Sequence, residues 1–415
     1  MDIAILGTIT KGESLESTKR SLEELKALAL TLEIDGQEQI IQSRETPVPS
    51  TYFGSGKVEE IKLIAESINA SILIVDDTLS PAQIRNLENI LELQIIDRSF
   101  LILQIFSIRA KTNEAILEVR LAQNEYMLPR LVGLGKSLSR QGGGTYNAKG
   151  PGETKLELDR RKLLDDISRV KRELAKIRKA KATSRKRRQK NEVPIVVLVG
   201  YTNAGKSATY NSLVTLLDNY DSKLTFEEDM LFATLDTKSK VLKAENRPPF
   251  ILIDTVGFIH KLPHELVNSF ESTLSDIKDA DLIIHVVDGL NASPEEMKIT
   301  KEILEKLEAN EIERIIVVTK SDLIEGPVLL NEDFLPISNK TKDNIDLLVS
   351  NIYYNIYNDN VIRDLIIPFE DGHIVNYLKE NNNVIFANYM DNGVHIKTSL
   401  TPREVKRYEK YIINA

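Results

Sequence analysis

Residues 194–207 read PIVVLVGYTNAGKS, an apolar run that passes directly into a glycine-containing loop. The apolar run predicts a strand that is buried on both faces, and the residues that follow, as far as Leu217, have the pattern of a helix. The eight residues from Gly200 match GxxxxGKS, in which backbone N–H groups and a helix N-terminus hold phosphates. This order of strand, loop and helix predicts an α/β fold with a phosphate-binding loop, the P-loop.

The P-loop residues have separate expected tasks. Lys206 is expected to reach the β- and γ-phosphates of a nucleotide, and the hydroxyl of Ser207 is expected to bind Mg²⁺. The predicted nucleotide contacts of this loop are Gly200, Tyr201, Thr202, Asn203, Ala204, Gly205, Lys206 and Ser207. The sequence GSGK at residues 54–57 lacks the required spacing, and we interpret it as the start of an ordinary helix.

A second buried strand, FILI at residues 250–253, ends in the sequence DTVG. An aspartate at this position can hold the water shell of Mg²⁺, and the N–H of the glycine can sense the γ-phosphate. The predicted contacts are Asp254, Thr255, Val256 and Gly257. Between the two motifs lies FATLD, which comprises Phe232, Ala233, Thr234, Leu235 and Asp236. A lone threonine is weak evidence, but this position favours Thr234 as a second Mg²⁺ ligand. The predicted catalytic residues are Lys206, Thr234, Asp254 and Gly257.

Selection of the base is predicted at a third strand, IIVV at residues 315–318, and the TKSD sequence after it. The carboxylate of Asp322 can accept hydrogen bonds from N1–H and the N2 amino group of guanine, a donor pair that adenine lacks. The usual motif is NKxD, so Thr319 is expected to weaken a contact between this loop and the P-loop. The predicted base contacts are Thr319, Lys320, Ser321, Asp322, Ser338, Asn339 and Lys340. Guanine is favoured, and use of ATP is left open.

Phe258 follows the DTVG sequence, where many signalling GTPases have a glutamine that orients the attacking water. An apolar ring cannot orient water. We therefore expect slow intrinsic hydrolysis, with a partner surface that supplies the missing group or orders the loops.

The first 110 residues alternate short apolar runs with amphipathic stretches, which predicts a parallel sheet covered by helices. Two further helices are expected at about 114–126 and 155–190, joined by a loop at 133–152 that is rich in glycine and contains Lys136, Arg140 and Lys149. In the second helix an apolar seam is formed by Leu156, Leu163, Ile167, Val170, Leu174 and Ile177. The pair is predicted to form a hairpin; a flexible linker is the alternative for its loop.

Positive charge is concentrated on this hairpin. Residues 153–190 contain 16 Lys or Arg against 6 Asp or Glu, a local charge of +10 in a chain whose net charge is −8. A basic element on an acidic protein is typical of a surface that binds a polyanion. The alternative is a solvated, frayed helix end.

Composition limits the remaining classes. The chain of 415 residues contains no cysteine, which excludes disulfides, thiolate zinc sites and a cysteine nucleophile. No run reaches the roughly 18 apolar residues typical of a membrane span, and the first residues lack the pattern of a signal peptide. We expect a cytoplasmic protein, with peripheral membrane association left open.

Several motifs resemble the HflX family of ribosome-associated GTPases. They are GSGKVEEI (54–61), LSPAQIRNL (79–87), IDR (96–98), LPRL (128–131) and GPGETKLE (150–157), together with GYTNAGKS, FATLD and DTVGF. They extend over roughly residues 50–260. Ala208, Thr319 and Asn339 depart from the usual family residues.

The resemblance implies an N-terminal α/β domain (1–112), a helical hairpin with a basic glycine-rich loop (113–192), a GTPase domain with a mostly parallel sheet (193–358) and a small C-terminal α+β domain (359–415). It also implies GTP hydrolysis stimulated by the ribosome, binding of the large subunit and its RNA through the hairpin, and dissociation or rescue of ribosomes under stress. An asparagine at the position of Asn203 holds K⁺ in related bacterial GTPases. We expect a monomer that binds GTP and GDP, with no DNA partner.

Two alternatives are left open for the function. One is a GTPase that checks immature ribosomal subunits. The other is a nucleotide-responsive RNA-binding module with little turnover.

Overall fold

The structure is a computed structural model that describes residues 2–138, 151–191, 193–217, 238–244, 247–259, 261, 276–290, 294–326, 328, 330 and 332–413. The chain forms two compact units, the first built mainly on the residues up to Ser184 and the second mainly on those from Arg185 onward. Within the described ranges, no helix is both long and apolar enough to cross a membrane.

The first unit contains a four-stranded parallel sheet in the order β2-β1-β3-β4. Its strands are β1 (Asp2–Ile9), β2 (Ile34–Gln42), β3 (Ile72–Val75) and β4 (Gln94–Asp97). The helices between and after them are α1 (Leu15–Thr31), α2 (Ser55–Ile68), α3 (Pro81–Leu91) and α4 (Arg98–Arg109). The predicted alternation and the parallel sheet are confirmed.

Local sequence explains where these helices begin. The side chain of Ser14 accepts a hydrogen bond from the backbone of Ser17 at the start of α1, and Ser80 forms a capping box with Gln83 at the start of α3. Such caps pair the backbone N–H groups that a first helical turn leaves without partners. Gly54 precedes α2, so the GSGK sequence is an ordinary helix start as predicted.

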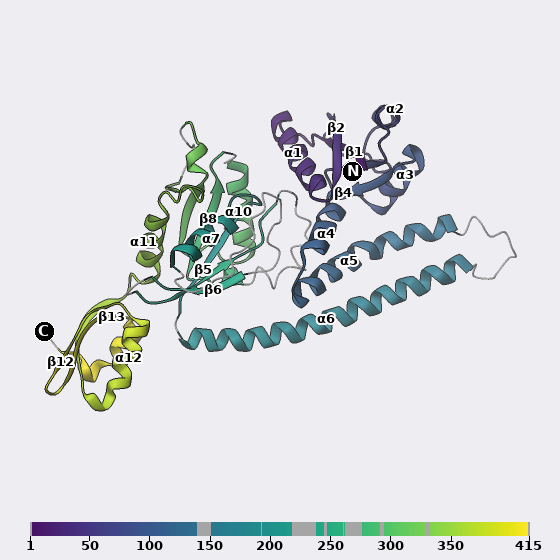
Figure 1. Cartoon of the computed structure of the whole chain (residues 1–415). Helices are drawn as coiled ribbons and strands as arrows, with labels where there is room; N and C mark the ends of the chain where they lie inside the picture. Colours follow the sequence, from purple (N-terminus) through teal and green to yellow (C-terminus); the bar gives the residue numbers. More distant parts are fainter. Residues whose placement is uncertain are drawn as a thin grey trace. The chain divides into compact units, whose positions relative to one another are not determined.

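The hairpin consists of α5 (Asn113–Leu138) and α6 (Pro151–Asn191), which lie side by side in Figure 1. They share an apolar cluster of Leu117, Leu121, Ile167, Val170 and Leu174, with Leu128 and Ile177 packed against it. The prediction of a loop over 133–152 is wrong at both ends, because residues 133–138 belong to α5, and Pro151 and Gly152 to α6. Glycine costs only about 1 kcal/mol inside a helix, and proline suits a first helical turn. Residues 139–150 lie outside the described ranges.

The second unit contains a six-stranded sheet in the order β10-β9-β8-β5-β7-β6, parallel except for β6. Its strands are β5 (Ile195–Gly200), β6 (Lys238–Leu242), β7 (Phe250–Asp254), β8 (Leu282–Asp288), β9 (Arg314–Thr319) and β10 (Leu335–Pro336). The described helices are α7 (Lys206–Leu217), α10 (Pro294–Lys306) and α11 (Ile345–Ile356), with a 3-10 turn η2 (Ser321–Leu323). A mostly parallel sheet with a central P-loop is the predicted fold class.

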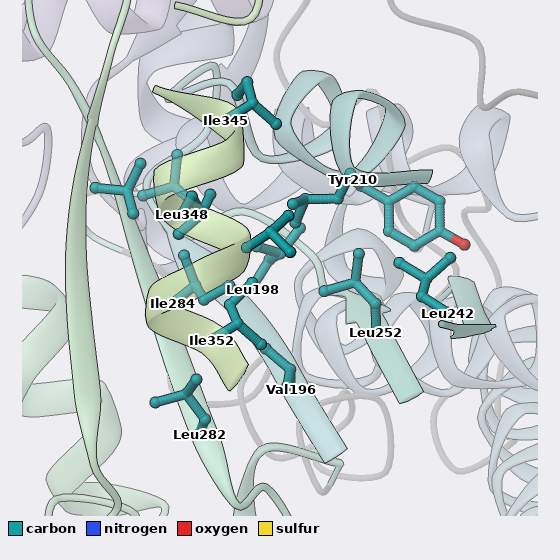
Figure 2. Packing of buried hydrophobic residues seen from close by; sticks show 14 of the residues in the cluster. Val196, Leu198, Tyr210, Leu242, Leu252, Leu282, Ile284, Ile345, Leu348 and Ile352 are labelled. Atoms are coloured by element: carbon teal, nitrogen blue, oxygen red, sulfur yellow. The ribbon is translucent and has the colours of Figure 1, made fainter. Parts of the chain in front are cut away.

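Strand β5 is buried on both faces, which places the P-loop at the centre of the sheet. Val196 and Leu198 belong to one apolar cluster, together with residues of α7 and α11 (Figure 2). Val197 and Val199 belong to a second cluster, together with Leu304 of α10. Because successive side chains of a strand point to opposite faces, an unbroken apolar run can fill both.

The C-terminal part carries a separate antiparallel sheet in the order β11-β13-β12. Its elements are β11 (Val361–Ile367), η3 (Phe369–Asp371), α12 (Gly372–Asn381), β12 (Val384–Met390), β13 (Gly393–Leu400), α13 (Pro402–Arg407) and η4 (Glu409–Tyr411). One apolar cluster contains Leu365 of β11, Ile396 of β13 and Leu378 of α12, so the helix packs on the sheet. This is the predicted small α+β element.

Candidate nucleotide site

The P-loop connects the end of β5 to the first residue of α7. Lys206, the first residue of that helix, donates hydrogen bonds from Nζ to the carbonyl oxygens of Gly200 at 3.1 Å and Tyr201 at 2.6 Å. Burial lowers the pKa of the Lys206 ammonium to about 8, although the charge of Asp254 acts in the opposite direction. A buried cation that rests on backbone carbonyls is suited to meet an anion that enters the loop.

Ser207 and Asp254 bring two oxygen ligands together beside the loop. The hydroxyl of Ser207 donates to Oδ2 of Asp254 at 2.8 Å, and Asp254 is fully buried at the end of β7. Mg²⁺ prefers hard oxygen ligands and commonly takes one or two from protein. The chemistry of this pair therefore fits Mg²⁺.

The backbone holds the DTVG segment against the P-loop. The N–H of Thr202 donates to the carbonyl of Phe258 at 2.7 Å, and the N–H of Phe258 donates to the carbonyl of Gly200 at 3.0 Å. A side chain at Gly257 would lie 2.8 Å from Cα of Thr202 and 2.9 Å from Nζ of Lys206, so only glycine fits there. The Phe258 ring is buried in the apolar cluster beside β5 and does not offer a polar group to the site.

The base-loop residues lie at the ends of β9 and β10. The hydroxyl of Ser338 donates to Oδ1 of Asp322 at 2.7 Å, which holds the carboxylate in one orientation. Oγ1 of Thr319 lies 2.8 Å from the carbonyl oxygen of Ala204 in the P-loop and 3.2 Å from that of Val287. The Thr319 hydroxyl therefore contacts the P-loop directly, and the expectation that this contact is weaker than that of asparagine stays a prediction.

Three known protein families match successive parts of this chain, and together the matches cover most of it. Residues 19–107 match "GTP-binding GTPase N-terminal", residues 109–188 match "GTP-binding GTPase Middle Region", and residues 195–320 match "50S ribosome-binding GTPase". The GTPase HflX of Caldanaerobacter subterraneus subsp. tengcongensis is 41% identical over 412 residues, which cover 99% of this chain and 94% of the relative. The chain belongs to the HflX family of GTPases.

Two further similarities were found, one to a relative and one to a solved structure. The GTPase HflX of Escherichia coli is 38% identical over 324 residues, 78% of this chain and 72% of the relative. The crystal structure of a GTP-binding protein from Sulfolobus solfataricus in complex with GDP is 24% identical, with a TM-score of 0.45 over 86% of this chain and 99% of that one. The resemblance seen in the sequence is confirmed, and this HflX family member is a GTPase that binds and hydrolyses GTP.

The structure of this HflX family member brings most of the predicted site residues together. The P-loop, Asp254 to Gly257 and the base-loop residues follow β5, β7, β9 and β10 of one sheet, in which β8 lies between β9 and β5. Phe232, Ala233, Thr234, Leu235 and Asp236 lie outside the described residues. Lys340 is exposed and follows Asn339 in the second base loop.

Sequence reasoning missed Asp288, the last residue of β8. Its Oδ2 accepts a hydrogen bond from Nζ of Lys320 at 2.9 Å, which fixes the lysine of the TKSD sequence. The signal was present, because Asp288 and Gly289 follow an apolar strand just as Asp254 does. In open α/β sheets, ligands bind at the carboxyl ends of the strands, and the carboxylate of Asp288 lies at such an end.

One further titratable group lies buried in the same sheet. His285 in β8 is 2% exposed, and its Nδ1 has no hydrogen-bond partner among the described residues. Burial, with the charges of Arg314 and Lys206 adding to it, lowers the pKa of His285 to about 3. This histidine of the HflX fold is therefore neutral at physiological pH.

Proposed function

We propose that this GTPase holds Mg²⁺·GTP in the site formed by the P-loop, DTVG and the two base loops. Lys206 neutralises the β- and γ-phosphates, the amide of Gly257 senses the γ-phosphate, and Asp322 reads guanine. The 2.8 Å contact between Ser207 and Asp254 supports a metal position in which Ser207 binds Mg²⁺ and Asp254 orders its water shell. Mg²⁺ would supply neutralising charge at the phosphates.

The second part of the proposal is that the hairpin binds the ribosome, on the large subunit and its RNA. The observation that carries it is the exposed basic surface of α6. Ile167, Val170 and Leu174 of this helix pack on α5. The basic residues exposed to solvent include Arg160, Arg172, Lys176 and Arg178. RNA phosphates are bound by such charge with release of counterions, so affinity falls as salt rises.

Carboxylates of both helices pair with some of the hairpin's cations, and those of residues 153–190 are already subtracted in the local charge of +10. Asp166 is held by Arg120 at 2.7 Å and by Arg169 at 2.5 Å, and Glu125 of α5 pairs with Lys171 at 2.8 Å. The carboxylates are thus used within the hairpin. The remaining cations are available to a polyanion, which supports RNA as the partner.

We further propose that ribosome binding stimulates hydrolysis and that GTP-bound protein dissociates ribosomes. Burial of Phe258 supports the first part, because the ring cannot position water and a partner must order the catalytic loops. Dissociation rests on the family resemblance and on the hairpin as an anchor independent of the nucleotide site.

Cosedimentation with separated subunits tests the partner. We expect binding to the large subunit with a non-hydrolysable GTP analogue, weaker binding with GDP, and loss of binding as salt is raised. Replacing Arg172, Lys176 and Arg178 with Gln should reduce it, whereas replacing the same number of exposed lysines on α10 should not. Equal binding by both variants would contradict a role for α6.

A separate experiment distinguishes action on intact ribosomes from action on immature subunits. Light scattering with intact ribosomes and GTP should report dissociation, and phosphate release should show many turnovers per protein molecule. Replacement of residues 139–150 by a neutral linker of equal length should preserve basal hydrolysis and abolish dissociation. Binding restricted to immature subunits would favour an assembly role, and binding without turnover would favour an RNA-binding module.

We also propose that Asn203 contributes to a K⁺ position beside the phosphates. Asn203 has a φ of 60°, a left-handed conformation that asparagine adopts more readily than most residues. Its carbonyl-containing side chain is a suitable oxygen ligand for a monovalent cation. Hydrolysis in K⁺ should exceed hydrolysis in Na⁺, and Asn203→Ala should remove the difference.

The four-domain division is likewise a proposal, with boundaries near residues 112, 192 and 358. Separate apolar clusters in the first sheet, the hairpin, the six-stranded sheet and the C-terminal sheet support it. Limited proteolysis should cut near these positions before it cuts inside the sheets.

A further inference from the structure

A continuous chain of hydrogen bonds runs from the second base loop to the P-loop. Lys342 Nζ donates to Oγ of Ser212 at 3.1 Å, and that hydroxyl donates to Oδ1 of Asn339 at 3.0 Å. Nδ2 of Asn339 donates to Oγ1 of Thr209 at 3.0 Å, and Thr209 donates to the carbonyl of Gly205 at 2.9 Å. No assigned motif of the nucleotide site includes Ser212, Thr209 or Lys342.

The direction of every bond in this chain is fixed. A hydroxyl has one proton, and Thr209 gives its proton to the carbonyl four residues earlier, so it can only accept from Asn339. Ser212 likewise gives its proton to Asn339 and accepts from Lys342. Because Thr209 is fully buried and Ser212 is 2% exposed, water cannot readily replace a missing partner. Asn339 is the one member that both donates and accepts through separate atoms.

Two successive carbonyls of the P-loop accept side-chain hydrogen bonds, one from the base loop and one from Thr209 in α7, whose backbone N–H also donates to the same carbonyl. Thr319 reaches the carbonyl of Ala204 at 2.8 Å, and Thr209 reaches that of Gly205 at 2.9 Å. A peptide group is planar, so fixing the carbonyl of Ala204 also orients the N–H of Gly205, and fixing that of Gly205 orients the N–H of Lys206. These amides belong to the set that holds phosphates in a P-loop.

The same loop also contacts the residue that reads the base. Ser338, which precedes Asn339, donates to Oδ1 of Asp322 at 2.7 Å and accepts from the N–H of Thr341 at 3.1 Å. Neighbouring side chains of one short segment therefore contact the guanine reader and the P-loop helix. A shift of this segment on base binding would move both contacts.

We propose that Asn339 is a positioning residue that couples guanine binding to the phosphate-binding amides, with Thr319 acting in parallel. The inference rests on the proposed guanine position at Asp322. Thr319 and Asn339 are two of the three residues that depart from the usual family motifs, and both make hydrogen bonds toward the P-loop or its helix. They supply two separate hydrogen-bonded connections between its base half and its phosphate half.

The test is the release rate of a fluorescent GDP analogue from the intact chain. Asn339→Leu keeps the approximate side-chain shape but removes both hydrogen bonds, so release should become about tenfold faster, equivalent to about 1.4 kcal/mol. Thr209→Val should have a similar effect, and Thr209→Ser should restore the wild-type rate. Because both residues act in one chain, the double variant should release GDP no faster than either single variant.

Asn355→Leu is the matched control, since Asn355 is half-buried and, among the described residues, its side chain donates to the carbonyl of Asn351 within α11. It should leave GDP release unchanged. If Asn339→Leu fails to fold, Asn339→Ala removes the same bonds without added bulk. Folded Asn339 variants that release GDP at the wild-type rate, or a double variant whose effects simply add, would overturn the inference. Failure of the wild-type chain to bind GDP would instead contradict the proposed nucleotide site.

Discussion

The first and second units contain parallel and mostly parallel sheets, yet the carboxyl ends of their strands are used differently. In the first unit Asp76 directly follows β3 and Asp97 ends β4, and both carboxylates are fully buried against arginines of the same unit. In the second unit β5 and β7 end at a P-loop and at Asp254, whose neighbour Ser207 offers a further oxygen ligand. One sheet edge is filled by its own side chains, and the other is built for a ligand.

The difference shows that the architecture of a sheet does not assign its function. Parallel α/β sheets commonly bind ligands at the carboxyl ends of their strands. In the first unit Arg98 is 1% exposed and contacts both Asp76 and Glu24 at 2.5 Å, so the charges at that edge are already paired. The residues at strand ends, and what pairs them, decide between a structural and a ligand-binding edge.

The largest expected effect concerns the ligand-binding edge. Lys206→Ala should lower GTP hydrolysis by roughly 100-fold or more, because it removes the cation that meets the phosphates. Phosphate release measures the loss, and circular dichroism should show an unchanged fold. Near-normal hydrolysis by a folded variant would mean that the phosphates bind elsewhere, and the comparison between the two edges would fail.

The corresponding change at the filled edge should affect stability. Arg98→Met removes a buried cation that pairs with both Asp76 and Glu24, and leaves Lys261, at 2.7 Å, as the remaining cation on Asp76. Breaking a buried pair from one side costs about 3 to 5 kcal/mol, and Lys261 should bring the loss toward the lower value. Urea unfolding of the first unit, followed by its own spectroscopic probe, measures the loss, and basal GTP hydrolysis should persist. A variant as stable as wild type would show that the arginine is not needed to fill this edge.

Base specificity sharpens the comparison within the ligand-binding edge. Asp322→Asn replaces an acceptor-only group by an amide that can donate, so GTP should bind roughly 10- to 100-fold more weakly and xanthine nucleotides should be preferred. Competition binding with GTP and XTP measures both shifts. Unchanged affinities for the two nucleotides would place base recognition at other residues.

The smallest effect, when it is measured over a single pH unit, is a dependence of stability on pH. The native pKa of His285 is about 3, and an unfolded histidine titrates near 6.5, so below about pH 6.5 the unfolded chain binds a proton that the native state does not. The free energy of unfolding should therefore fall by about 1.4 kcal/mol for each pH unit from 6.5 toward 3.

Denaturation at pH 6.5 and 5.5 measures this change before most carboxylates titrate. His285→Leu should lose much of the pH dependence, whereas His373→Leu, at an exposed position, should retain it. Identical pH dependence in wild type and His285→Leu would show that the buried histidine is not responsible.

Sequence patterns predicted the parts of the fold that depend on local physics. The apolar run of β5 and the GxxxxGKS match identified the P-loop, because a doubly buried strand and a phosphate loop each require specific residue types. The ends of α5 and α6 differ from the prediction, since Gly133, Gly135 and Gly152 of the expected loop lie inside helices. A glycine inside a helix costs only about 1 kcal/mol, so a group of glycines does not by itself show where a helix ends.

In the candidate site, too, some residues could be assigned from local sequence and others could not. Lys206, Asp254 and Asp322 could be assigned from motifs, because their spacing to a strand is fixed. The hydrogen bonds of Thr319 and Asn339 to the P-loop region could not, since they join residues more than a hundred positions apart. Whether a different side chain can make the usual contact with the P-loop depends on distances between atoms. Those distances are set only when the sheet has folded.

The order in which strands are joined has a consequence for synthesis. All four strands of the first sheet lie within the first 97 residues, so a growing chain can complete that sheet early. The central strand β5 pairs with β7 and β8, whose residues follow much later, and β10 closes the sheet only at Pro336. During translation the apolar face of β5 must therefore wait for its partners, and over that interval it is a target for chaperones.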